Sequence, residues 1–217
     1  LPGAETEGRE MVRLFEALRR AAGLDLHLEA RIGPEECDPV EILALLLDGE
    51  YGIVHFAGHG VFDEARPNHS GWVFGREDDG RLRTLSATEI FRARRAPRLV
   101  FANACFSAAA GRRPTAFEQN RKLAGMAEAF FERGVANYIG SGWAVGDGPA
   151  VEFAREFYAQ ALAGVPARRL RSAAGAAGAK SLGEALGAAR SLILDQGPTW
   201  GAYQHYGDPM AKLLADR

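Results

Sequence analysis

A histidine and a cysteine stand at the ends of two apolar segments, and together they could act as a base and a nucleophile. His59 follows the run Tyr51–Ala57, and Cys105 follows the run Arg98–Ala104. A free thiol has a pKa of about 8.5, so a nucleophilic cysteine needs a neighbouring base to hold the thiolate at neutral pH. Histidine can do this and later donate a proton to a leaving group. We therefore predict a His59/Cys105 dyad that attacks a carbonyl carbon.

The residues around this pair fit a reaction that passes through an oxyanion. Gly58 and Gly60 flank His59 and leave the backbone uncovered. The backbone amides of Gly60 and Cys105 are the predicted donors to the oxyanion. Taken alone, Cys105 would more often be a small buried hydrophobic residue than a nucleophile.

Two other residues near His59 are candidates for supporting roles. His55 lies within the same apolar run and is predicted to be a hydrogen-bonded structural residue that supports the site. For Asp63, which follows His59, two interpretations stay open. The carboxylate orients His59, or it caps the following loop.

Strands and helices are predicted to alternate along the chain. Continuous apolar runs predict buried strands at 51–57, 98–104 and 135–140. Helical periodicity and capping signals predict helices at 6–22, 39–48, 122–133, 149–163 and 181–195. This order is typical of an α/β fold in which helices cover both faces of a mostly parallel sheet. Ligands meet such sheets at the carboxyl ends of the strands, so adjacent parallel strands would bring His59 and Cys105 together.

Weaker signals complete the predicted fold. Alternating leucines predict a half-buried strand at 24–28, and Asp79-Gly80 predicts a hairpin turn between strands at 72–75 and 81–85. The remaining predicted elements are a short helix at 86–93, a loop at 107–120 and a strand at 202–206.

Composition excludes several classes of function. The chain has 217 residues, of which 47% are apolar, and this predicts a single domain over residues 1–217. A net charge of -2 gives no general reason to bind nucleic acid. Two cysteines exclude a disulfide scaffold and fit a reducing cytoplasm. We expect no metal site, cofactor or membrane span, because no ligand spacing is evident and no apolar run reaches the ~20 residues of a spanning helix.

A basic, alanine- and glycine-rich segment runs from Arg168 to Lys180. It lacks the apolar periodicity that would bury one face. Two interpretations are open. Residues 167–180 form a flexible insertion, or they form an activation loop that is cut after Arg169, Arg171 or Lys180.

Four motifs, in order along the chain, resemble those of the CHAT peptidases, relatives of caspases, separases and gingipains. They are HFAGHGVFD at 55–63, NACFS at 103–107, GSGWAVGD at 140–147 and WGAYQHYGDP at 200–209. The sequence LPGA at 1–4 is similar to a motif that precedes the first large helix of the family. The resemblance covers nearly the whole chain.

The resemblance implies a caspase-like three-layer α/β sandwich and peptide-bond cleavage by His59 and Cys105. Family members usually carry an earlier strand and an attached sensor region, and we expect both to be missing from these 217 residues. The start at Leu1, without a methionine, predicts a fragment of a longer protein. Residues 103–107 do not match the caspase pattern Gln-Ala-Cys-x-Gly, so specificity for aspartate is not implied.

The resemblance also suggests which residue precedes the cut. In separases, a segment similar to 143–147 supplies an acid to the pocket for a basic substrate residue. Asp147 would do the same here and favour Arg or Lys before the scissile bond. The alternative is that Asp147 caps the helix that follows it.

The predicted function is that of a cytoplasmic cysteine endopeptidase. CHAT peptidases resemble effectors of bacterial immunity, so the expected partners are a protein substrate, such as a gasdermin or a defence-system subunit, and an upstream sensor. No nucleic acid or membrane partner is expected. The competing interpretation is a non-catalytic interaction module, a pseudo-protease, and a small-molecule hydrolase is a third.

Overall fold

The computed structural model describes residues 2–61, 69–86, 89, 96–106, 127–128, 130–132, 134–172 and 178–214, with only the backbone at 105–106 and 171–172. The chain divides into two compact units. The sheet unit comprises Ile32–Ala144 and Ala202–Gly207, and the helical unit comprises Leu1–Arg31, Val145–Gly201 and Asp208–Arg217.

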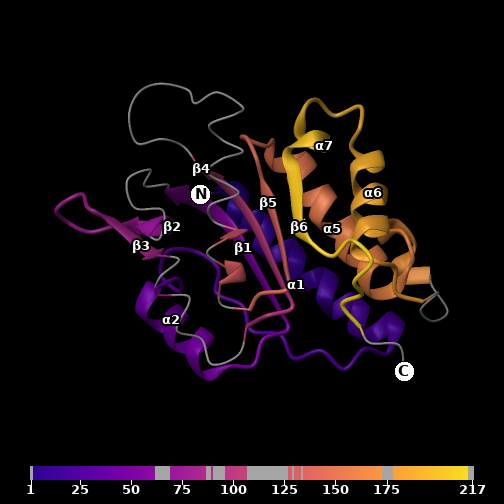
Figure 1. Ribbon diagram of the computed structural model, residues 1–217, viewed down its shortest axis with the longest axis horizontal. Helices are drawn as coiled ribbons and strands as arrows, with labels where there is room; N and C mark the ends of the chain where they lie inside the picture. The colour runs from indigo at the N-terminus through magenta and orange to yellow at the C-terminus, as the bar shows by residue number, and fades with distance from the viewer. Residues whose placement is uncertain are drawn as a thin grey trace. The chain divides into compact units, whose positions relative to one another are not determined.

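Six strands form the sheet of the sheet unit, in the order β3-β2-β1-β4-β5-β6 (Figure 1). They are β1 (Ile53–Val61), β2 (Gly71–Arg76), β3 (Leu82–Ser86), β4 (Leu99–Phe106), β5 (Asn137–Ser141) and β6 (Tyr203–Gly207). The central pairs β1–β4 and β4–β5 are parallel, and the outer pairs are antiparallel. The predicted α/β class with a parallel centre is confirmed, and it is consistent with a caspase-like fold.

Helix α2 (Pro39–Asp48) belongs to the sheet unit and begins at a side-chain cap. Asp38 accepts hydrogen bonds from the backbone N–H groups of Val40 at 2.8 Å and Glu41 at 3.2 Å. Three apolar side chains of α2, Ile42, Leu43 and Leu46, pack against the core of this unit. Capping and apolar packing together explain why this short segment is helical.

Aromatic rings form the centre of the sheet-unit core. The rings of Phe56 and Trp72 stack with centroids 4.5 Å apart, and Trp72 also contacts Phe130 at 5.6 Å. Phe130 in turn stacks on Tyr138 of β5 at 5.3 Å. All four side chains are buried, so this row of rings joins β1, β2 and β5 to the segment that carries Phe130.

The helical unit contains α1 (Pro2–Ala22), α5 (Asp147–Ala163), the 3-10 helix η2 (Ala167–Ser172) and α6 (Leu182–Leu192). It also contains the first three residues of α7 (Thr199–Ala202), whose last residue belongs to the sheet unit. Helix α5 packs against both α1 and α6, and its side chains from Phe157 to Ala163 are all buried. The rings of Phe15 in α1 and Tyr158 in α5 lie 5.0 Å apart. Gly164 ends α5 in the left-handed conformation, at φ 68°.

Several predicted boundaries differ from those observed. The strands at 51–57 and 98–104 extend to Val61 and Phe106, because their last residues still pair with neighbouring strands. His59, Gly60 and Cys105 therefore lie within strands and not beyond them. Helices α1 and α5 begin at Pro2 and Asp147, earlier than predicted, and the predicted helix at 181–195 ends at Leu192.

The predicted strand at 24–28 is wrong. The segment is irregular, although its alternating leucines are half-buried, so the alternation reports burial and not pairing. The hairpin at 71–86 is confirmed, with Gly80 in its turn at φ 83°. The predicted loop at 107–120 and most of the helices at 86–93 and 122–133 lie outside the described residues.

Candidate active site

His59 and Cys105 lie next to each other on the two central parallel strands. Strands β1 and β4 stay in register from Ile53 opposite Leu99 to Gly60 opposite Phe106, and His59 is the partner of Cys105. Neighbouring strands lie about 4.8 Å apart, so the two backbones meet at hydrogen-bonding separation. His59 is exposed, as a residue that meets a substrate must be. Their catalytic roles stay a prediction.

The glycines beside His59 occupy crowded positions. A Cβ atom on Gly58 would come within 2.8 Å of the Phe56 ring, so a larger residue there would force the buried ring to move. Gly60 is buried, with Trp72 of β2 as its partner on one side and Phe106 of β4 on the other. Its amide therefore lies at the last position where β1 and β4 pair. Donation from this amide to an oxyanion stays a prediction.

Two side chains from β5 and β6 bind the residues that directly precede Cys105. The Ser141 hydroxyl donates to the backbone oxygen of Ala104 at 3.1 Å. The Tyr203 hydroxyl donates to Oδ1 of Asn103 at 3.2 Å. All four residues are buried and belong to the sheet unit.

Of the two residues predicted to support the site, the structure describes His55 and not Asp63. His55 is half-buried, and its ring stacks on that of Phe101 with centroids 5.0 Å apart, which fits a structural position in β1. Asp63 lies outside the described residues.

Asp147 lies in the helical unit, in the first turn of α5. The N-cap of that helix is Gly146, so Asp147 is not the cap, although the positive end of the helix dipole favours its charge there. The carboxylate is exposed and lies against Gly3, where an added Cβ would be 2.4 Å from the carboxylate carbon. Gly3 thus lacks a side chain where the acid needs the space.

The model of the CHAT domain family matches residues 1–208 of the chain. This chain belongs to the CHAT family. CHAT domains fall within the caspase-like clan and are typically cysteine peptidase-like. A search of curated proteins found no match.

The basic segment of this CHAT domain is tied to α5 at both ends. Oε2 of Glu156 accepts the N–H of Ala167 at 2.9 Å, where η2 begins, and the N–H of Lys180 donates to the backbone oxygen of Gln160 at 3.1 Å. The side chains of Glu156 and Gln160 are themselves bonded at 2.7 Å. Arg169 is exposed within η2, Arg171 is described only in its backbone, and residues 173–177 lie outside the described residues.

Sequence reasoning did not single out Asn103, Ser141 or Tyr203. Each lies inside one of the quoted family motifs, so the signal that could have found them was their position beside the predicted nucleophile strand.

Among the residues that the structure describes, no group of histidine, cysteine, aspartate and glutamate side chains is arranged to hold a metal ion. Nor does that part of the chain contain a helix long and apolar enough to cross a membrane.

Proposed function

We propose that this CHAT domain is a cysteine endopeptidase in which Cys105 is the nucleophile and His59 the general base and acid. The pairing of the two residues across the parallel strands β1 and β4 is the observation that carries the proposal. Two residues distant in the chain, one a base and one a thiol, share one position at the carboxyl ends of central strands. Such positions are where open α/β sheets bind ligands.

The proposed reaction has two steps, formation of a thioester on Cys105 and its hydrolysis. The Cys105 thiolate attacks the carbonyl carbon of the substrate, and the amides of Gly60 and Cys105 stabilise the oxyanion. The C–N bond then breaks, and His59 gives its proton to the leaving amine. Water deprotonated by His59 hydrolyses the thioester, which releases the acid and restores the free enzyme.

Asp147 provides the proposed preference for Arg or Lys before the scissile bond. Its exposed carboxylate lies at a helix N-terminus, where the helix dipole and the space left by Gly3 favour a charged group. The proposed setting is bacterial defence in the cytoplasm, where an upstream sensor activates the domain. The substrate is a protein partner, such as a gasdermin or a defence-system subunit.

A peptide library tests the dyad. Cys105→Ala is expected to abolish cleavage, and His59→Ala to lower kcat/KM by roughly 10²- to 10⁴-fold, because it removes the base and acid. Cys37→Ala and His27→Ala, at the other described cysteine and an exposed histidine, are matched controls expected to keep wild-type rates. No cleavage by the wild type, together with no labelling of Cys105 by iodoacetamide, would instead support a non-catalytic interaction module.

The same library tests the substrate preference. Asp147→Ala is expected to remove the preference for Arg and Lys over Leu, while Glu152→Ala, an exposed acid on the same helix, keeps it. An Arg preference that survives Asp147→Ala would exclude this carboxylate from the pocket.

A further inference from the structure

Strand β4 loses its neighbour on one side just before Cys105. On the β1 side, pairing continues to Phe106. On the β5 side, the last paired position is Ala102 opposite Gly140. Among the described residues, those from Asn103 to Phe106 therefore have backbone ladder partners on the β1 side only.

Beyond Ala102, hydrogen bonds from two side chains hold β4 on the β5 side in place of backbone pairing. The Ser141 hydroxyl bonds the Ala104 oxygen at 3.1 Å, and the Tyr203 hydroxyl bonds Asn103 at 3.2 Å. Ser141 and Tyr203 are register partners at the end of the β5–β6 pair. One pair of facing residues thus holds both residues that precede the nucleophile.

Both hydrogen bonds are buried, so water cannot replace either of them if it is lost. Ala104 and Tyr203 are fully buried, and Ser141 is 2% exposed. A buried carbonyl or hydroxyl that loses its partner has no water to replace it, so the strand must move or keep an unsatisfied group. A movement of the strand would shift the backbone of Cys105 relative to His59.

We propose that Ser141 and Tyr203 are positioning residues that fix the end of β4 so that Cys105 faces His59. This inference deepens the proposed function and rests on it. Ser141 acts through the Ala104 backbone, and Tyr203 acts through the Asn103 side chain. Displacements of about 1 Å in a reacting pair can lower rates by about 10²-fold, so two remote hydroxyl groups can control the reaction.

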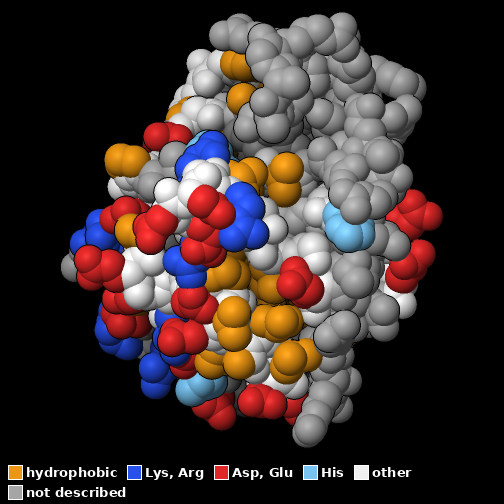
Figure 2. Space-filling model, turned by 90° about the vertical axis from the view of Figure 1, so that its left-hand side faces the viewer, with side chains coloured by type: hydrophobic (Ala, Val, Ile, Leu, Met, Phe, Trp, Pro, Cys, Tyr) orange, Lys and Arg blue, Asp and Glu red, His pale blue; other side chains and the backbone are white. Residues whose placement is uncertain are grey.

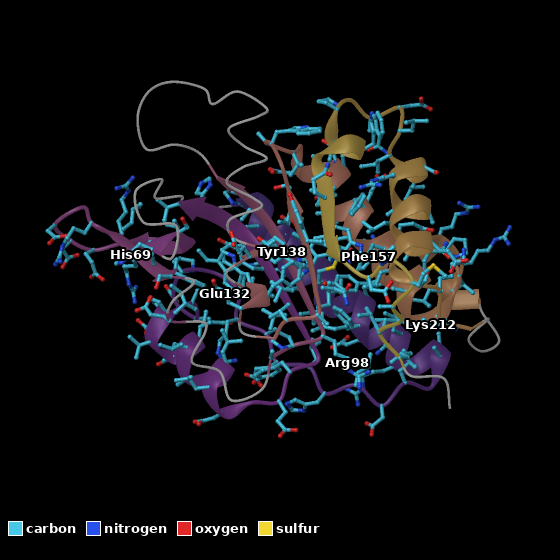
Figure 3. All side chains as sticks on the ribbon, in the orientation of Figure 1. His69, Arg98, Glu132, Tyr138, Phe157 and Lys212 are labelled. Atoms are coloured by element: carbon cyan, nitrogen blue, oxygen red, sulfur yellow. The ribbon has the colours of Figure 1, made fainter. Side chains whose placement is uncertain are left out.

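The experiment removes one oxygen atom at a time. Tyr203→Phe and Ser141→Ala each delete a bonded hydroxyl and add no volume. The matched control is Tyr138→Phe, at a residue of β5 that is labelled in Figure 3. Tyr138 is also fully buried, but its hydroxyl has no hydrogen-bond partner among the described residues. All three variants lose one hydroxyl group from the same sheet.

Two measurements are made on each variant. In peptide cleavage, Tyr203→Phe and Ser141→Ala are expected to lower kcat about tenfold or more while KM changes less than about twofold, and Tyr138→Phe is expected to keep both. In alkylation by iodoacetamide, followed by mass spectrometry over a range of pH, the Cys105 profile is expected to move to higher pH, because His59 no longer supports the thiolate. The Cys37 rate reports intact folding in the same sample.

The outcomes separate the two proposals. If the wild type cleaves, and Tyr203→Phe and Ser141→Ala match Tyr138→Phe in both measurements, the positioning role is wrong and the dyad stands. If the wild type cleaves nothing but Cys105 still reacts with iodoacetamide, the alkylation profiles alone decide the positioning role. If Cys105 is also unreactive, the endopeptidase proposal fails and the positioning role fails with it. An unchanged Cys105 profile in both variants would overturn the positioning role.

Discussion

At the scale of single residues, Asp38 joins two elements of the sheet unit. Its carboxylate accepts the first N–H groups of α2 and forms an ion pair with Arg83 of β3. The hydrogen bond from the Glu41 backbone is the main cause that lowers the pKa of Asp38, with smaller contributions from the Val40 N–H and the Arg83 charge. The charged form of Asp38 therefore stabilises the folded state.

This gives a prediction for acid solution. A group whose pKa is lowered on folding stabilises the protein above its unfolded pKa, near 3.9, and loses that contribution as the pH falls through the folded value. Asp38→Asn keeps an N-cap but removes the charge, so we expect it to be less stable than the wild type at pH 7 and equal to it near pH 2. Urea unfolding at both pH values measures this difference.

The control for Asp38 is the other end of the same helix. Asp48→Asn removes a charge from the last residue of α2, where the helix dipole disfavours an acid. This variant is expected to be as stable as the wild type at pH 7, or slightly more stable. A constant difference between Asp38→Asn and the wild type from pH 7 to pH 2 would show that its charge is not the cause.

The sequence indicated some site residues and not others for a physical reason. His59 and Cys105 were visible because each follows a strand-length apolar run, which is a local pattern. The Tyr203–Asn103 bond joins two residues that are 100 positions apart, and its existence depends on which strands become neighbours. No local pattern contains that information.

At the scale of elements, two hydrogen bonds to α5 hold the ends of the basic segment. Glu156 is buried, and its carboxylate binds the N–H of Ala167 at the start of η2. Arg168 and Arg169 follow directly and are exposed. Loss of the carboxylate would free the beginning of η2 and let it open locally.

We expect Glu156→Ala to increase the rate of trypsin cleavage after Arg168 or Arg169 by about tenfold, the effect of losing one charged hydrogen bond. The test is made in a Cys105→Ala background, so that any self-cleavage is absent, and the cut sites are identified by mass spectrometry. Glu152→Ala, at an exposed acid of α5, should leave this rate unchanged. Faster cutting spread evenly over all sites would indicate global destabilisation and contradict the local role.

Capping residues made helix starts predictable, whereas strand identity depended on tertiary neighbours. Asp38 caps α2, and Ser181 forms a capping box with Glu184 at the start of α6. Such signals act within one turn, so they are visible in the sequence. The alternating segment at 24–28 had the correct pattern for a strand and no ladder to join. Pairing requires a second strand with a free edge, which a single segment cannot reveal.

At the scale of the whole molecule, both compact units are assembled from segments that are separate in sequence. The length and apolar content of the chain predict a single domain. Hydrophobic periodicity is a local pattern, so it cannot show which separate segments share a core. On the face shown in Figure 2, acidic and basic side chains are interleaved, in keeping with the net charge of -2. The parallel centre of the sheet was predictable because its strands are continuous apolar runs, as buried parallel strands require.

The position of β6 determines what a cut in the basic segment would produce. β6 follows that segment in the chain, yet it pairs with β5, which precedes it, over five register positions. Helix α6 likewise follows the segment and packs on α5, which precedes it. A cut after Arg169 would therefore yield a non-covalent heterodimer whose two polypeptides share one sheet, with Asn103 on the larger and Tyr203 on the smaller.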